Sequence, residues 1–165
     1  MARISIFDSD PAGLACDAPE KEQTRAFQGW MKEELDEGAI LVIPEIVDYE
    51  IRRSLILAGS SKSIKRLDDL YTVSVRYLPI TTAAIRRATG LWADVRRQGR
   101  PTAGKKALDG DVILAAQALE FCFEADDWQI LTENVAHLER YVGARARSRR
   151  AVVDEWLKAS SEERP

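Results

Sequence analysis

Short runs of mostly apolar residues alternate along this chain with longer segments in which apolar residues recur every three or four positions. The short runs predict buried strands at residues 4–7, 40–43, 73–78 and 129–132. The longer segments predict helices at residues 21–37, 45–58, 63–71, 83–97, 109–123 and 135–141. Such alternation is typical of a mainly parallel sheet with helices on both faces. The predicted fold class is therefore α/β, a three-layer α/β/α sandwich with a mainly parallel central sheet.

Two segments are rich in residues that form turns and are predicted to be loops, and the last part of the chain is basic. Residues 8–13 are rich in turn-forming residues, and residues 98–106 contain two glycines and a proline. The chain becomes basic near residue 145, and a short apolar stripe at helical spacing follows. We therefore expect a domain at residues 1–144 and a basic C-terminal tail with a short docking helix at residues 145–165.

Charge, hydropathy and cysteine content narrow the function classes. The net charge is only -3, so any binding of nucleic acid has to come from local basic patches. The sequence has no apolar run of the roughly 18 residues that a membrane span requires, and its start does not have the layout of a signal peptide. Cys16 and Cys122 lack metal-ligand spacing and are interpreted as buried free thiols. These features predict a cytoplasmic protein without a membrane partner.

Acidic or amide side chains lie at the points where the predicted strands end. Asp8 directly follows the first strand, and Glu50 lies in the helix after the second. Asp111 is near the start of the alanine-rich helix, and Thr132 and Asn134 lie at the end of the fourth strand. The carboxyl ends of parallel strands lie at one edge of a sheet, where such folds bind ligands. We therefore expect these side chains to converge there.

Each of these residues also has a purely structural interpretation. Asp8 can cap a helix or close a loop, and Glu50 can pair with Arg53 at a spacing of three on one helix face. Asn134 can form a turn. Of the two aspartates that head the late helix, Asp109 is the better candidate for the helix cap. That assignment leaves Asp111 available for chemistry.

A cluster of carboxylates points to a bound cation. Several carboxylates within a few ångströms of one another cannot all stay ionised without positive charge between them. Hard oxygen ligands select Mg²⁺ or Mn²⁺. Such an ion can activate water and neutralise charge on a phosphodiester, so the pattern predicts hydrolytic phosphoryl chemistry.

In order and spacing, these motifs resemble those of PIN domains, particularly the VapC toxins of prokaryotic toxin–antitoxin pairs. The resemblance spans residues 4–141. It rests on the strand that ends in Asp8 and on residues 44–53, which fit the loose pattern P-x-x-V-x-x-E-x-R-R. It rests further on residues 111–118, which fit D-x-x-L-A-A-x-A, and on the T-x-N motif at residues 132–134.

The resemblance implies a metal-dependent ribonuclease with an RNA substrate. It implies that Asp8, Glu50 and Asp111 hold one or two Mg²⁺ or Mn²⁺ ions. Asn134 stands where some members of the family carry a fourth acid, and in that place it would support the metal through water. The resemblance also implies an antitoxin protein as partner, and a homodimer.

RNA binding needs contacts to phosphate as well as a metal site. The loop with Arg100, Lys105 and Lys106 runs into the helix of Asp111, which makes it our first candidate for guiding RNA. The candidate RNA-contacting residues are Ser9, Arg53, Arg100, Lys105, Lys106 and Thr132. His137, the single histidine, is expected to have a structural or surface role.

Two other functions are compatible with parts of the sequence. One is a PIN fold without catalysis, used to bind RNA or protein. The other is a phosphatase of the haloacid-dehalogenase type, because residues 8–10 imitate its D-x-D start and residues 126–127 its late acidic motif. The phosphatase interpretation gives Glu50 and Asp111 no role, and it places the late acids before a strand instead of after one.

Overall fold

The structure is a computed structural model, and it describes residues 2–100, 104, 109–125 and 127–162. The elements of these residues are, in chain order, β1 (Ile4–Phe7), α1 (Ser9–Cys16), α2 (Glu22–Asp36), β2 (Ile40–Pro44), α3 (Glu45–Leu57), α4 (Ser61–Val73), β3 (Arg76–Leu78), α5 (Thr82–Arg97), α6 (Gly110–Phe121), β4 (Trp128–Thr132), α7 (Val135–Val142), the 3₁₀ turn η1 (Gly143–Arg145), β5 (Ala146–Ser148) and α8 (Arg149–Glu162). The helices and strands predicted from the apolar periodicity are all present, although β3 is shorter than expected.

The strands form one sheet in the order β3-β2-β1-β4-β5, and every neighbouring pair is parallel. β1 lies at the centre, where all four of its side chains are buried. A strand buried on both faces reads as a continuous apolar run, which is why the run at Ile4–Phe7 was a dependable signal. The predicted parallel sheet is confirmed.

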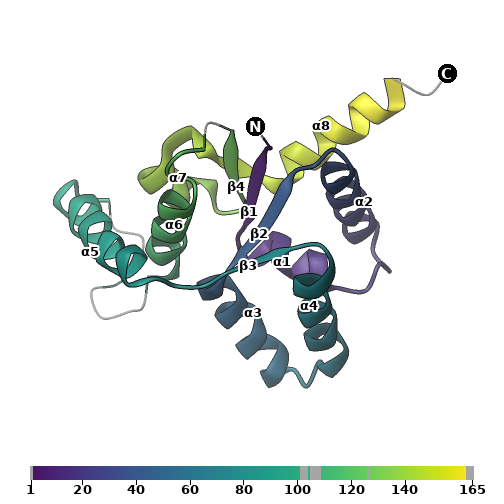
Figure 1. Cartoon of the computed structure of the whole chain (residues 1–165), viewed down its shortest axis with the longest axis horizontal. Coiled ribbons are helices and arrows are strands. Elements are labelled where there is room, and N and C mark those ends of the chain that lie inside the picture. The colour runs from purple at the N-terminus through teal and green to yellow at the C-terminus, as the bar shows by residue number, and fades with distance from the viewer. Residues whose placement is uncertain (1, 101–103, 105–108, 126, 163–165) are drawn as a thin grey trace.

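Helices cover both faces of this sheet (Figure 1). In the figure, α1, α2 and α4 lie on one side of the strands, and α6 and α7 lie on the other, with α5 packed outside α6. On the first side three aromatic rings pack together. The ring centroid of Phe27 lies 5.4 Å from that of Phe7 and 5.5 Å from that of Trp30. On the other side, the residues of α6 from Val112 to Ala118 are buried. The predicted three-layer α/β/α sandwich is confirmed.

Residues 8–13 were predicted to be a loop, and this prediction is wrong. They belong to α1, which begins directly after β1 with Asp8 as its N-cap. Turn-forming residues such as aspartate and serine are also the residues that start helices, and proline is tolerated in the first turn because the N–H that it lacks would have no partner there. The composition therefore fitted a helix start as well as it fitted a loop.

The basic segment near residue 145 is part of the sheet. Ala146–Ser148 form β5, a strand that the sequence analysis missed, and it pairs in parallel with β4. Three residues of mixed polarity are too short to give a periodic signal. The helix that follows, α8, contacts α2 and buries Val152 and Val153. The pairing of β5 with β4 places the start of α8 next to the end of β4.

Cys16 and Cys122 are buried free thiols, as predicted. Burial raises the pKa of each thiol to about 11. In the part of the chain that the structure describes, no helix combines the length and the hydropathy that crossing a bilayer requires.

Candidate active site

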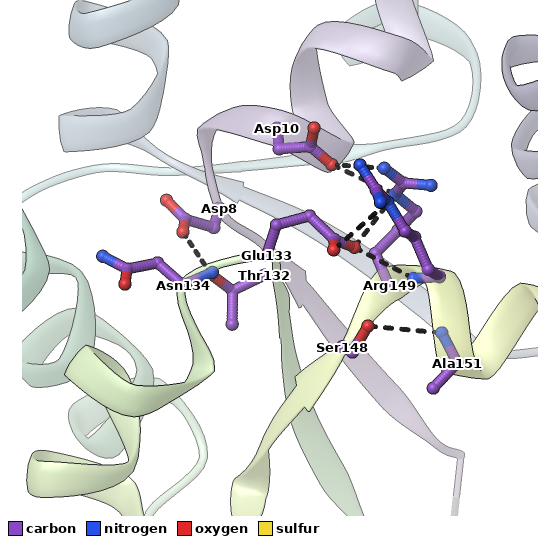
Figure 2. A network of polar contacts seen from close by, with 9 residues as sticks. Asp8, Asp10, Thr132, Glu133, Asn134, Ser148, Arg149 and Ala151 are labelled. Carbon is purple, nitrogen blue, oxygen red and sulfur yellow. Dashed lines mark hydrogen bonds and ion pairs between the residues drawn. The ribbon is translucent and has the colours of Figure 1, made fainter.

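Asp8 and Thr132 follow and end neighbouring strands at the carboxyl edge of the sheet. Phe7 of β1 lies opposite Leu131 of β4, and the backbone N–H of Asp8 donates to the carbonyl of Leu131 at 3.0 Å. Thr132 Oγ1 donates a hydrogen bond to Asp8 Oδ2 at 2.6 Å (Figure 2). The other oxygen, Asp8 Oδ1, accepts from the backbone N–H of Ser9 at 2.6 Å and caps α1. Both oxygens of Asp8 are therefore held in place at this edge.

Glu50 reaches the same edge from α3, the helix that begins where β2 ends. Ser9 Oγ donates to Glu50 Oε2 at 2.6 Å, so one residue contacts both Asp8 and Glu50. On its other side the Glu50 carboxylate lies against Gly110, the first residue of α6. A Cβ atom built at Gly110 would collide with Glu50 Oε1, so Glu50 can take this position only because Gly110 has no side chain.

Asp111 comes to this edge at the start of α6. Asp109 is the N-cap of that helix, as predicted, because its Oδ1 accepts from the backbone N–H of Val112 at 3.3 Å. Asp111 is therefore not used as the cap. Its Oδ2 atom lies 3.1 Å from Nδ1 of His137, and that nitrogen is 2.8 Å from Nδ2 of Asn134. Asn134 also donates its backbone N–H to Thr132 Oγ1 at 2.8 Å, which links Asp111 back to the end of β4.

The charge at this edge is poorly compensated. Burial raises the pKa of Asp111, the hydrogen bond with His137 lowers it, and the negative charges of Asp8 and Asp109 raise it further. Among the described residues, no lysine or arginine pairs with Asp8, Glu50 or Asp111. Oxygen donors with excess negative charge suit a hard divalent cation.

The side chains as they stand do not form a closed metal cage. Within the described ranges, no three histidine, cysteine, aspartate or glutamate side chains are arranged so that they could hold one metal ion together. The carboxylates of Asp8 and Glu50 instead accept hydrogen bonds from the hydroxyls of Thr132 and Ser9. Bringing Glu50 onto an ion shared with Asp8 and Asp111 therefore requires a side-chain rotation.

Comparisons with known proteins address the fold around this edge. No protein-family model and no curated protein matches the chain. The solved structures that match it include three with TM-scores of about 0.6. A chain of VapBC2 from Rickettsia felis, crystallised with a DNA fragment from the promoter, has a TM-score of 0.63 at 13% identity and aligns over 88% of this chain and 98% of that one. A chain of FitAcB from Neisseria gonorrhoeae has a TM-score of 0.61 at 14% identity, over 88% and 97%. A chain of DNA-bound VapBC from Salmonella typhimurium has a TM-score of 0.59 at 18% identity, over 90% and 99%. The fold is PIN-like.

This PIN-like fold extends over nearly the whole of each matching chain, and it confirms the fold that the resemblance to PIN domains implied. In a PIN-like fold of this topology, β1 and β4 are neighbours although they are far apart in sequence. That adjacency brings Asp8 beside Thr132 at the carboxyl edge of the sheet.

The predicted RNA-contacting residues differ in their surroundings. Ser9 and Thr132 contact the carboxylates, as described above. The guanidinium of Arg53 lies over the ring of Tyr49 at 5.0 Å from its centroid, instead of on Glu50. Arg100 is exposed after the end of α5, and its carbonyl accepts from Arg140 Nη1 at 3.1 Å. Lys105 and Lys106 lie outside the described residues, and their role stays a prediction.

The phosphatase alternative does not fit the PIN-like fold. Asp127 precedes β4, and its carbonyl accepts from the N–H of Ile4 at the start of β1. It therefore lies at the amino edge of the sheet, at the opposite end from Asp8. Asp10, the second acid of the imitated D-x-D start, pairs with Arg149. The two acidic motifs that this reaction needs are thus at opposite ends of the strands.

Sequence reasoning did not assign two residues that contact this edge. His137 was expected to have a structural or surface role, and its ring lies against Asp111. Its position three residues after Asn134 on a predicted helix was the available signal. Arg149 was placed in a basic tail, and its buried guanidinium pairs with Asp10 and Glu133 (Figure 2). No local pattern in the sequence marked it.

Proposed function

We propose that this chain is a divalent-metal-dependent ribonuclease and the toxin of a toxin–antitoxin pair. The observation that carries the proposal is the set of three carboxylates, Asp8, Glu50 and Asp111, at one edge of a PIN-like sheet, with no lysine or arginine paired to them among the described residues. Structural carboxylates are normally paired or fully solvated, so a group like this one indicates a functional site.

In this proposal Asp8, Glu50 and Asp111 are the ligands of Mg²⁺ or Mn²⁺, and Asn134 supports the site through water. The bound ion would supply positive charge to the phosphodiester and would lower the pKa of a water molecule. The chain's own residues orient the donors: Ser9 and Thr132 hold the carboxylates of Glu50 and Asp8 by their hydroxyls. With these carboxylates bound to an ion, the hydroxyls of Ser9 and Thr132 would be available to donate to a phosphate oxygen.

Arg53 and Arg100 are the proposed phosphate contacts on the described part of the surface. Arg53 lies one helical turn from Glu50 on α3, so a strand of RNA that reaches the carboxylates would pass close to it. Lys105 and Lys106 are proposed to extend the same contact along the segment before α6. Because the net charge is -3, this local basic surface has to provide the attraction for RNA.

The proposed partners and location follow from the solved structures that this chain is similar to. Those structures are described as VapBC and FitAcB assemblies, which supports an antitoxin protein as the partner of this chain. A homodimer and a cytoplasmic location belong to the same proposal, because a toxin that cleaves cellular RNA has to act where that RNA is.

Replacing Asp111 by Asn tests the proposal, because it removes one negative charge and almost no volume. We expect the wild-type protein to cleave RNA when Mn²⁺ is added, and the variant to lose cleavage by about 100-fold or more. Asp94→Asn is the matched control, since Asp94 is an exposed acid that pairs with Arg97 on α5. In parallel, thermal unfolding with and without Mn²⁺ measures binding directly, because a ligand at 100 times its Kd stabilises the folded state by about 2.7 kcal/mol.

Undiminished cleavage by Asp111→Asn would remove this residue from the mechanism. A wild-type protein that neither cleaves RNA nor gains stability from Mn²⁺ would contradict the proposal as a whole. That second result would favour the alternative of a PIN fold without catalysis.

A further inference from the structure

Arg149 is a buried cation placed between two segments of the candidate site. Its side chain is only 5% exposed, although arginine is rarely buried without partners. Its Nε and Nη2 atoms donate to Asp10 Oδ2 at 3.0 and 2.9 Å, and its Nε lies 3.5 Å from Glu133 Oε1 (Figure 2). Glu133 in turn accepts from the backbone N–H of Arg150 at 3.0 Å. Both acids therefore bind residues at the start of α8.

These two acids flank the residues of the site. Asp10 lies in the first turn of α1, two residues after Asp8, and Glu133 lies between Thr132 and Asn134. The ion pairs of Arg149 therefore connect the same two backbone segments that the hydrogen bond from Thr132 to Asp8 connects. They form a second link between α1 and the end of β4, parallel to the first link and outside the carboxylate cluster.

From this geometry we infer that Arg149 is a positioning residue for the carboxylate site, an inference that rests on the proposed function. The guanidinium holds the first turn of α1 and the turn after β4 at a fixed separation, and this separation sets where the Asp8 carboxylate lies relative to Asn134 and Asp111. A planar guanidinium can contact two carboxylates at once, which a lysine ammonium does less well. Because Arg149 is nearly inaccessible, it acts through these neighbours and does not touch RNA.

The test compares Arg149→Gln and Arg149→Lys with a matched variant, Arg147→Gln. Arg147 is in β5, two residues earlier, and pairs with exposed Glu155, away from the site. We expect Arg149→Gln to lower kcat for RNA cleavage by about tenfold or more with KM within about twofold, because ground-state binding is unaffected. Arg149→Lys should recover part of kcat, and Arg147→Gln should behave as wild type.

Two further measurements keep the inference testable if Arg149→Gln folds poorly. Asp10→Asn removes the anchor on α1 from an acid that is 43% exposed, so folding should tolerate it, and kcat should fall as in Arg149→Gln. Hydrogen exchange should show faster exchange of the backbone N–H groups of Ala12 and Asn134 in both variants than in Arg147→Gln. This second measurement needs no catalysis.

The outcomes separate this inference from the proposed function. If the wild-type protein cleaves RNA and Arg149→Gln and Asp10→Asn cleave it equally fast, the positioning role is overturned and the ribonuclease stands. If exchange quickens but kcat is unchanged, the ion pairs only stabilise the fold, and the inference is also overturned. A wild-type protein that lacks both cleavage and stabilisation by Mn²⁺ instead overturns the proposed function, and it leaves Arg149 with no site to position.

Discussion

Asp111 is the carboxylate whose ionisation the fold opposes. Its pKa is raised by burial and by the charges of Asp8 and Asp109, against the opposing effect of His137. A carboxyl group with a higher pKa in the folded state than in the unfolded chain binds more protons when folded, so the free energy of unfolding falls as the pH rises through that window. Above the window, the charge of Asp111 destabilises the metal-free protein.

We therefore predict that Asp111→Asn makes the metal-free protein more stable at neutral pH while it abolishes the response to Mn²⁺. The gain should shrink as the pH falls through the raised pKa of Asp111, and it should be absent below about 3.9, the ordinary pKa of an aspartate, because the wild-type carboxyl is then neutral as well. Urea unfolding of both proteins in chelator at several pH values measures it. Equal stability of the wild-type protein and Asp111→Asn at every pH would show that the fold does not disfavour the ionised form of Asp111.

Individual residues show how much of the candidate site could be predicted from the sequence. The assignment of Asp109 as the cap, with Asp111 left available, followed from the preference of helix starts for a short acceptor, and the structure agrees. The partnership of Asp111 with His137 could not be derived in this way. It depends on how α6 and α7 pack, and no spacing between two residues 26 positions apart encodes that contact.

At the scale of elements, α3 contacts the start of α6 at a glycine, Gly110. Gly110 lets the Glu50 carboxylate lie against the backbone of α6, and a Cβ atom there would meet Glu50 Oε1. Gly90, in the interior of α5, has nothing within 4 Å of the position of its Cβ. The two glycines can therefore be compared directly: an added Cβ atom would meet Glu50 at Gly110 and would meet no atom at Gly90.

We predict opposite outcomes for alanine at these two positions. Gly110→Ala should displace Glu50 and lower RNA cleavage by about 10- to 100-fold, as is usual when a residue that orients a metal ligand is changed. Gly90→Ala should leave cleavage unchanged and stabilise the protein by roughly 0.5–1 kcal/mol, because alanine is the better helix former. Kinetics with added Mn²⁺ and urea unfolding give both quantities. If Gly110→Ala retained full activity, Glu50 could not be held at its site by this contact.

Elements also show where periodicity stops being informative. α2 and α6 are long and were predicted close to their observed ends, because many apolar positions repeat in each. The eight residues of α1 include a proline and a glycine, and β5 has only three residues. In such short segments the tertiary neighbours decide the conformation. α1 is helical because Asp8 caps it and α2, α3 and α4 pack around it.

For the molecule as a whole, the parallel topology explains why the site could be anticipated in part. Once the strands are parallel, the residues that follow them share an edge, so the convergence of Asp8 and Thr132 follows from the strand pattern alone. The ion pair between Asp10 and Arg149, 139 positions apart, requires in addition the strand order, with β5 beside β4. Strand order is set by three-dimensional packing, so no short segment of the sequence predicts it.

The overall charge makes a last prediction about how this protein would bind RNA. A chain with net charge -3 repels RNA at long range, so binding depends on the few basic groups near the site. For single-stranded RNA each phosphate contact contributes about 0.7 to the slope of log K against log salt concentration. Arg53→Gln and Arg100→Gln should therefore each weaken binding and reduce that slope by about 0.7.

Lys32→Gln provides the matched control, because Lys32 pairs with Asp36 in the last turn of α2, at the amino edge of the sheet and away from the carboxylates. Titrations of labelled RNA at several salt concentrations, with chelator present to prevent cleavage, give the slopes. An effect of Lys32→Gln as large as that of Arg53→Gln would mean that RNA binds without regard to the carboxyl edge. A reduced slope for Arg53→Gln and Arg100→Gln but not for Lys32→Gln would instead place the bound RNA against these two arginines, as the proposed function requires.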